Sequence, residues 1–325
     1  MLALRAMTLE QLRIFVAVAE REHMTRAAEV LHLTQSAVSA AISTLEAAYS
    51  TTLFHRVGRR IELTEAGRLF RDEARAVLAR AAAAEQALVD LGGLKRGTLA
   101  LQASQTVASY WLPRHLVAFQ RIYPEVQIRL AIGNTVQVVK SLIDGIAELG
   151  FAEGPVGEPA LSAERIECDR LVLVVAPQHP WATLDRLQPR DLSESDWVLR
   201  EVGSGTRSVL EAALSRLGVA PNSLKVVLEL PSNEAVREAV EAGAGATVTS
   251  QLVAEAGLRS GALRRVAIDL PQRPFFIVRH RERHRSKAAE ALVALLKGSA
   301  SDAGVPRAVG GNVARSGTSR RTGKG

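Results

Sequence analysis

The first 63 residues carry apolar positions at helical spacing, in three short segments separated by polar breaks. The first segment predicts a helix from Leu9 to about Glu22. Thr25 then predicts the N-cap of a helix over 26–31, and Thr34 predicts the N-cap of a helix over 35–48. Small or apolar residues stand wherever the last two helices would touch: Ala27, Ala28, Leu31, Leu33, Val38, Ala41 and Ile42. This spacing is typical of a helix-turn-helix, in which His32 would occupy the turn and adopt a positive φ.

The outward face of the helix over 35–48 is polar but uncharged. It carries Gln35, Ser36, Ser39, Ala40 and Ser43. Gln can bind adenine through two hydrogen bonds, and Ser can donate or accept, so this face suits base recognition in a major groove. The same residues would also suit an ordinary solvated helix face, and the face alone leaves both interpretations open.

The segment 53–64 predicts two short strands joined by a turn at Gly58, as in the wing of a winged helix. Its strands carry the densest group of basic residues within 1–63, namely Arg56, Arg59 and Arg60. Phosphate contacts supply most of the affinity of a protein for DNA, whereas base contacts supply the discrimination. A polar face beside a basic wing therefore favours DNA binding.

A seven-residue apolar repeat follows Thr64, which predicts the N-cap of a long linker helix in the segment 64–95. The two apolar positions of the repeat are occupied by Phe70, Val77, Ala84 and Leu91, and by Ala74, Ala81 and Leu88. Such a repeat predicts that the helix pairs with the same helix of a second copy. The alternative is a helix that packs on its own domain.

From residue 96 to about 297, β-branched runs alternate with helical patterns, which indicates a βαβ-type domain. Strands are predicted over 97–102, 126–132, 147–152, 171–176, 197–200, 226–230 and 246–248. Several of them end in small polar residues, and a glycine-containing loop over 202–207 precedes a predicted helix over 208–217. Ligands of open α/β sheets bind at the carboxyl ends of strands, and helix N-termini favour anions. Ordinary N-capping is the alternative reading of the same residues.

The run TRAAEVLHLTQSAVSAAISTLEAAYSTTLFHRVGRRIELTEAG, from Thr25 to Gly67, resembles the N-terminal signature of LysR-type transcription regulators. The resemblance implies that Gln35, Ser36 and Ser39 contact bases and that Thr25, Arg56 and Arg59 hold the DNA backbone. With Ser43 and Arg60 these residues form the predicted DNA-binding set. Ala40 departs from the family, in which a longer polar residue is common at this position.

The resemblance also implies the overall fold: an all-α winged helix-turn-helix with a linker helix, then an α/β, two-lobed effector domain like a type 2 periplasmic binding protein. Lobe I would comprise about 96–166 and 268–297, and lobe II about 167–267. The ligand-binding residues that the resemblance implies are Ser104, Gln105, Thr106, Asn134, Thr135, Glu153, Ser204, Thr206, Ser232, Asn233 and Thr249. Most of them suit a small anion, whereas a carboxylate at Glu153 would repel one unless it is paired or faces an amine or a hydroxyl.

Composition narrows the function further. The net charge is +7, but much of it lies in the C-terminal segment 298–325, which predicts a disordered basic tail. Cys168 is the single cysteine, which excludes an intrachain disulfide, and no segment is apolar enough for a signal peptide or a membrane span. We therefore expect a cytoplasmic protein that is not an enzyme and needs no metal or cofactor.

The expected partners are double-stranded DNA with a partly palindromic promoter site, a small-molecule effector, a second copy or a dimer of dimers, and RNA polymerase. A transport binding protein would need a signal peptide or anchor and would leave the first ninety or so residues without a role. One alternative function stays open: an architectural DNA-binding protein without an effector, whose C-terminal domain only mediates oligomerisation.

Overall fold

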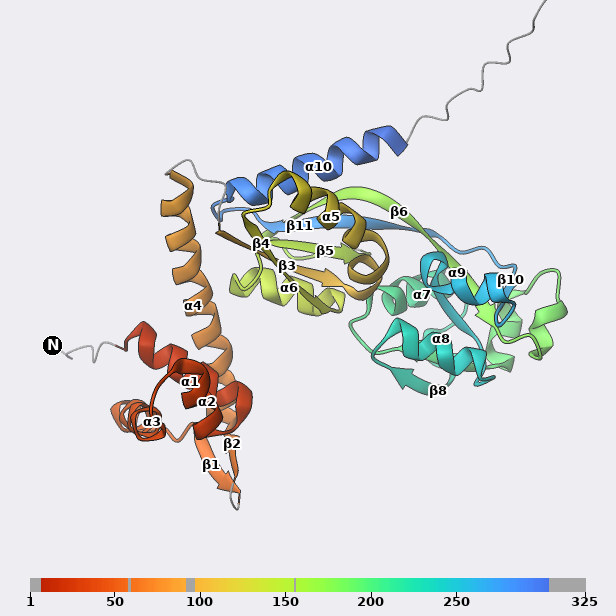
Figure 1. Cartoon of the computed structure of the whole chain (residues 1–325). Helices are drawn as coiled ribbons and strands as arrows, with labels where there is room; N and C mark the ends of the chain where they lie inside the picture. The colour runs from red at the N-terminus through yellow and green to blue at the C-terminus, as the bar shows by residue number, and fades with distance from the viewer. Residues whose placement is uncertain (1–6, 58–59, 92–96, 155, 304–325) are drawn as a thin grey trace, which may run out of the picture.

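The computed structural model describes residues 7–57, 60–91, 97–154 and 156–303. It contains a small N-terminal domain, one long helix and a C-terminal domain with two lobes (Figure 1). This is the predicted arrangement of a winged helix-turn-helix, a linker helix and a two-lobed α/β domain.

The N-terminal domain consists of α1 (Leu9–Arg21), α2 (Met24–Leu31), α3 (Gln35–Tyr49) and a wing of two strands, β1 (Phe54–Val57) and β2 (Arg60–Leu63). Its core is centred on Phe15, which is fully buried. The ring of Phe15 lies 5.5 Å from that of Phe54 and 4.7 Å from that of Phe70. One aromatic residue of α1 therefore joins the helices, the wing and the linker helix in a single core.

The predicted helix ends are confirmed at two positions and wrong at one. His32 ends α2 with a φ of 55°, and the Thr34 hydroxyl accepts a hydrogen bond from the Ala37 N–H (3.2 Å) at the start of α3. Thr25 is not an N-cap, because α2 begins at Met24, two residues before the predicted start. His23 caps it instead, with Nδ1 accepting from the Arg26 N–H (3.4 Å).

The linker helix α4 (Glu65–Leu91) begins as predicted, where the Thr64 hydroxyl accepts a hydrogen bond from the Gly67 N–H (2.9 Å). The first part of its apolar repeat does not face a second copy, because Phe70 and Ala74 pack into the core of the N-terminal domain. Farther along, Val77 is 47% exposed and Leu88 is 70% exposed. The first part of the repeat thus packs into the core of the N-terminal domain, and the later part forms a solvent-exposed apolar stripe.

Lobe I is built on a sheet in which β3 (Gly97–Ser104) runs parallel to both β4 (Val126–Gly133) and β5 (Leu149–Glu153). A π-helical turn (Val107–Trp111) leads into α5 (Leu112–Ile122), and α5 and α10 (Lys287–Ala303) pack on one face of the sheet. On the other face lies α6 (Thr135–Asp144), as Figure 1 shows.

Lobe II contains β7 (Asp196–Arg200) parallel to β8 (Lys225–Leu230), with the helices α7 (Gly205–Arg216), α8 (Asn233–Glu241) and α9 (Gln251–Ser260). Three short 3-10 turns complete it: η2 (Pro180–Thr183), η3 (Pro189–Glu194) and η4 (Pro221–Ser223). Trp197 is fully buried at the centre of this lobe.

One strand runs through both lobes. β6 (Leu161–Val175) pairs along its first two thirds with β11 (Gln272–His280), which also borders β5 in lobe I. Its last residues pair with β9 (Thr247–Ser250) and β10 (Arg264–Val266) in lobe II. The strand predicted over 171–176 is therefore only the end of a longer one, and the boundary between the lobes falls within β6.

Three further expectations need correction. The strand β3 continues to Ser104, beyond the predicted range 97–102, and α7 begins at Gly205, before the predicted residue 208. The helix α10 continues to Ala303, so the chain over 298–303 is helical where a disordered tail was predicted. The rest of the predicted tail lies outside the described residues.

An ion pair connects the linker helix to lobe I. Lys140 Nζ of α6 lies 3.5 Å from Asp72 Oδ2 of α4 and 3.0 Å from Asp144 Oδ2. Burial opposes ionisation of Asp72, but Arg71 and Lys140 together outweigh it and hold the pKa of this carboxyl below its ordinary value. The ion pair between Lys140 of α6 and Asp72 thus ties lobe I to α4.

Candidate functional site

The polar face of α3 is open to solvent. Gln35, Ser36 and Ser43 are exposed and Ser39 is half-buried, whereas Val38 and Ile42 of the same helix are buried in the core. The Ser36 hydroxyl lies 3.0 Å from the Thr34 hydroxyl at the helix start. The buried residues hold α3 in an orientation that leaves this face free for a partner.

The wing is fixed to α3 by Glu46, whose Oε1 accepts hydrogen bonds from the Leu53 N–H (2.7 Å) and the Phe54 N–H (3.1 Å). Arg56 is exposed on β1, and Thr25 is exposed on α2. Arg60 lies on β2 opposite Val57, and Arg59 lies outside the described residues. Figure 1 shows α3 and the wing at the end of the molecule that is remote from the two lobes.

Seven of the eleven predicted ligand-binding residues meet where the two lobes face each other. They are Gln105, Thr106, Asn134, Thr135 and Glu153 of lobe I, and Thr206 and Asn233 of lobe II. Together with Asp169, Arg200, Glu201, Glu234 and Arg273, which complete their hydrogen bonds, we call them the inter-lobe network.

Arg273 is at the centre of this network and is fully buried. Its Nε donates to Asp169 Oδ2 (3.1 Å), and its Nη2 bonds to the same oxygen. Its Nη1 donates to the Thr206 hydroxyl (2.7 Å) and lies 3.2 Å from Glu153 Oε1. One guanidinium, carried by β11 where the lobes join, therefore contacts a carboxylate of lobe I and a hydroxyl of lobe II.

A second branch of the network joins the lobes through Asn233. Its Nδ2 donates to the Thr106 hydroxyl (3.1 Å), and its N–H donates to Gln105 Oε1 (2.7 Å). The buried Arg200 donates to Asn233 Oδ1 and to both carboxylate oxygens of Glu201. Lobe closure in this structure thus rests on direct polar contacts between the facing strand and helix ends.

Glu201 contributes to the contact between the lobes in its ionised form. Burial opposes its ionisation, but hydrogen bonds and charge from Arg200, with a further bond from Asn134, hold the pKa of Glu201 below its ordinary value of 4.5. A depressed folded-state pKa contributes stability that is complete above the ordinary pKa and is lost as the pH falls through the folded value.

Replacing Glu201 by Gln is expected to flatten the acid side of the stability profile, because this carboxylate no longer takes up a proton on unfolding below pH 4.5. Thermal unfolding between about pH 6 and about pH 3, followed by tryptophan fluorescence, would measure the difference. Identical acid profiles for Glu201→Gln and the unmodified chain would contradict the assignment.

The other four predicted ligand-binding residues lie outside the network's hydrogen bonds. Ser104 ends β3 and Ser204 precedes α7; both are buried, and neither hydroxyl is bonded to any residue that the structure describes. Ser232 caps α8, accepting from the Ala235 N–H (3.0 Å), and Thr249 is buried in β9 opposite Val172.

Sequence reasoning missed the charged centre of the network. Arg273 and Asp169 lie on neighbouring strands in direct register, although 104 residues separate them in the chain. A usable signal was present for both, because each is a charged residue at the edge of an apolar run: Arg273 before Pro-Phe-Phe-Ile-Val, and Asp169, with Arg170, before Leu-Val-Leu-Val-Val.

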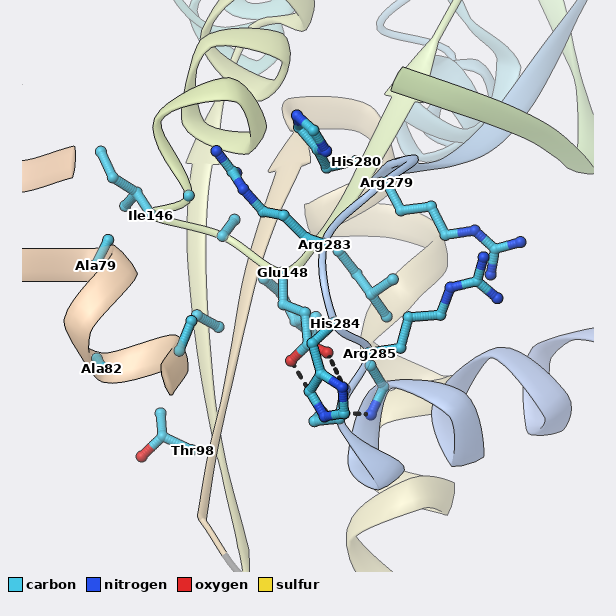
Figure 2. A pocket seen from close by; sticks show the side chains of 18 of the residues that line it. Ala79, Ala82, Thr98, Ile146, Glu148, Arg279, His280, Arg283, His284 and Arg285 are labelled. Atoms are coloured by element: carbon cyan, nitrogen blue, oxygen red, sulfur yellow. Dashed lines mark hydrogen bonds between the residues drawn. The ribbon is translucent and has the colours of Figure 1, made fainter. Parts of the chain in front are cut away.

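A separate cavity of about 910 Å³ lies between α4 and the amino ends of β3 and β5 (Figure 2). Ala79 and Ala82 of α4 line one side, and Glu148 lines the other, where it accepts from the Ser286 N–H (2.6 Å) and hydroxyl (2.9 Å). Burial, with the charge of nearby Arg283 and Arg80, lowers the pKa of His280 here. The cavity leaves open space between α4 and lobe I, at the strand ends opposite to the network.

Neither a metal site nor a membrane-spanning helix is found in the described ranges 7–57, 60–91, 97–154 and 156–303. No three or more His, Cys, Asp or Glu side chains gather there in a way that could hold a metal ion. None of the helices in these ranges is both long and apolar enough to span a bilayer.

Comparison with known proteins gives two family matches. The family model described as "Bacterial regulatory helix-turn-helix protein, lysR family" matches residues 9–68, and the "LysR substrate binding domain" matches residues 92–301. The HTH-type transcriptional regulator YeiE of Escherichia coli is 36% identical over 287 residues, covering 86% of this chain and 94% of the relative.

Two solved structures are similar to the chain. Full-length CbnR in complex with its target DNA has a TM-score of 0.67 at 22% identity, covering 90% of this chain and 100% of that one. The CcmR regulatory domain of Synechocystis PCC6803, in complex with 2-PG, has a TM-score of 0.58 at 26% identity, covering 63% of this chain and 98% of that domain. The chain belongs to the LysR family of bacterial DNA-binding transcription regulators, which are not enzymes.

Proposed function

We propose that the chain binds a partly palindromic promoter site as a dimer or dimer of dimers, and that a small polar metabolite at the inter-lobe network changes this binding. Gln35, Ser36, Ser39 and Ser43 would read bases, while Thr25 and the wing arginines Arg56, Arg59 and Arg60 would hold phosphates. The exposure of the α3 face and of Arg56 supports this division.

The observation that carries the effector proposal is the inter-lobe network itself. Polar side chains from the ends of β3, β5, α6, α7 and α8 meet there, although these segments are far apart in the sequence. A small molecule that replaces some of these contacts would change the free energy of lobe closure. The CcmR domain, whose structure contains 2-PG, supports a small-molecule effector for a relative of this chain.

The apolar stripe of α4 supports pairing with a second copy, because Val77 and Leu88 are largely exposed in the single chain. A dimer with two DNA-binding domains would bind two half-sites on one duplex, which is why we propose a partly palindromic operator. We further propose that the regulator acts in the cytoplasm and that its bound form contacts RNA polymerase.

Genome-wide footprinting of DNA bound by the full chain tests the DNA part of the proposal. We expect enrichment of short sites with two related halves close to promoters. Uniform occupancy without a shared sequence would favour a purely architectural role, in which the C-terminal domain serves only to oligomerise the protein.

Replacing Gly205 by Ala tests the effector part. A Cβ at Gly205 would lie 2.3 Å from the Glu153 carbonyl oxygen and 2.8 Å from the Thr135 hydroxyl, so it would push the two lobes apart. We expect small molecules that raise the melting temperature of the unmodified chain to have no effect on Gly205→Ala. Gly157→Ala is the matched control, because a Cβ there would meet nothing within 4 Å.

A thermal-shift screen of all three chains against a panel of small acids, amino acids and inorganic anions provides the measurement. Stabilisation of Gly205→Ala equal to that of the control would place the ligand outside the inter-lobe network. If no compound stabilised any of the three chains, the architectural alternative would be favoured.

A further inference from the structure

The inter-lobe network contains a buried carboxylate oxygen to which none of the described residues donates a hydrogen bond. Glu153 Oε1 accepts from the Thr106 hydroxyl (3.2 Å) and the Thr206 hydroxyl (3.4 Å), and it lies 3.2 Å from Arg273 Nη1. Glu153 Oε2 is equally buried, yet no residue that the structure describes bonds to it. A buried ionised oxygen without a donor is costly, so this atom marks a place where a donor is missing.

The charges around Glu153 do not compensate for the missing donor. Arg273 is shared between Asp169 and Glu153, and the second buried guanidinium, that of Arg200, is bonded to Glu201. With Glu234, which accepts from Gln105 and Tyr110 of lobe I, four described carboxylates therefore face two buried guanidinium groups at the contact between the lobes. A plain anion placed next to Glu153 Oε2 would add to this negative charge, whereas a hydroxyl or ammonium group would satisfy it.

An acceptor group, by contrast, would be favoured at the start of α7, beside Glu153. Ser204 precedes this helix of 12 residues, its side chain makes no capping bond, and its buried hydroxyl has no partner among the described residues. The first N–H groups of a helix also lack acceptors within the helix and favour a negative charge. The position of a Cβ on Gly205 lies 2.7 Å from Glu153 Cγ, so the two environments are adjacent.

We propose that the effector is a small carboxylic acid with a hydroxyl or ammonium group next to its carboxylate. The hydroxyl or ammonium group donates to Glu153 Oε2, and the carboxylate accepts from the Ser204 hydroxyl and the first N–H groups of α7. This inference rests on the proposed function, in which the inter-lobe network is the effector site. It changes the expected ligand from a simple anion to an acid that carries its own donor.

Two series of acids that differ only in the donor test the proposal. Acetate, glycolate and glycine share a carboxylate. Beside it, acetate carries no donor, glycolate carries a hydroxyl and glycine carries an ammonium group. Succinate, malate and aspartate form the same series with a second carboxylate. Calorimetric titration of the full chain is expected to show that at least one donor-bearing acid binds about ten- to a hundredfold more tightly than its donor-free parent.

Variants of the network assign the effect to its atoms. Glu153→Gln keeps the shape but removes the charge, and we expect the preference for donor-bearing acids to fall to within about threefold. Ser204→Ala is expected to weaken donor-bearing and donor-free acids alike, by about tenfold. Glu211→Gln removes a carboxylate from the same helix α7, outside the network, and is expected to keep the full preference. An unchanged tryptophan emission spectrum shows that each variant is folded, because Trp111, Trp181 and Trp197 all lie in the C-terminal domain.

The outcomes separate this inference from the proposed function. Equal binding of acids with and without the donor, or a full preference in Glu153→Gln, overturns the inference. So does a complete lack of binding by the donor-bearing acids. If donor-free anions such as sulfate bind, and Gly205→Ala abolishes that binding, the effector site stands and only the ligand class is wrong. Binding that survives Gly205→Ala overturns the effector site as well.

Discussion

Replacing Arg273 by Met is expected to destabilise the C-terminal domain by about 3–5 kcal/mol, because removal of one partner from a buried ion pair leaves the other charge uncompensated. Here the loss would leave both Asp169 and Glu153 buried without their guanidinium. Urea unfolding followed by tryptophan fluorescence measures this domain selectively, since the three tryptophans, Trp111, Trp181 and Trp197, all lie in it.

A matched control is available on the same strand. Arg279 of β11 is only half-buried, and Arg279→Met is expected to change the free energy of unfolding by less than about 1 kcal/mol. If Arg273→Met were as stable as Arg279→Met, the inter-lobe network would contribute little to the closed arrangement of the lobes. The effector would then have to act through other contacts.

Replacing Gln35 by Ala is expected to reduce discrimination between the operator and altered operators by about 1–3 kcal/mol, or about ten- to a hundredfold, because a two-bond contact to a base is lost. The affinity for unrelated DNA should change little. Gln35 is exposed at the start of α3, so the substitution leaves the core of the domain intact. Competition binding with systematically altered operators measures the effect.

Arg56→Ala serves as the complementary variant, because a phosphate contact carries no sequence information. Affinity should fall by a similar factor for every DNA sequence, and the slope of log K against log salt should decrease by about 0.9. If Gln35→Ala and Arg56→Ala weakened all sequences alike, the separation between a base-reading helix face and a phosphate-holding wing would be wrong.

The N-terminal domain could be predicted closely because its signals are local. Helical periodicity, the N-cap Thr34 and the turn at His32 each depend on residues only a few positions apart. The error at Thr25 has a local cause as well, since the His23 ring nitrogen can cap a helix in place of a hydroxyl. For α4, periodicity indicated that one face is covered but could not indicate what covers it. Phe70 and Ala74 are covered by the chain's own core.

The C-terminal domain was predictable in its alternation of strands and helices, and less so at its centre. Polar residues at strand and helix ends, such as Thr106 and Asn233, carry a visible signal because polar residues favour such positions. Arg273 meets Asp169 only through the register of β6 and β11, and nothing in the local sequence specifies a pairing across 104 residues. The charged core of the site therefore depends on the tertiary fold.

The helix α6 has a consequence for how the two binding events influence each other. It is 10 residues long, or about 15 Å, and Asn134 at its start bonds to Glu201 of lobe II while Lys140, farther along, pairs with Asp72 of α4. Because α6 contacts both the inter-lobe network and the linker helix, a displacement of one would move the other, and thermodynamic linkage is reciprocal. Under the proposed function, operator DNA that repositions α4 would alter the affinity for the effector by the same factor by which the effector alters the affinity for DNA. The promoter would then regulate the binding of the metabolite.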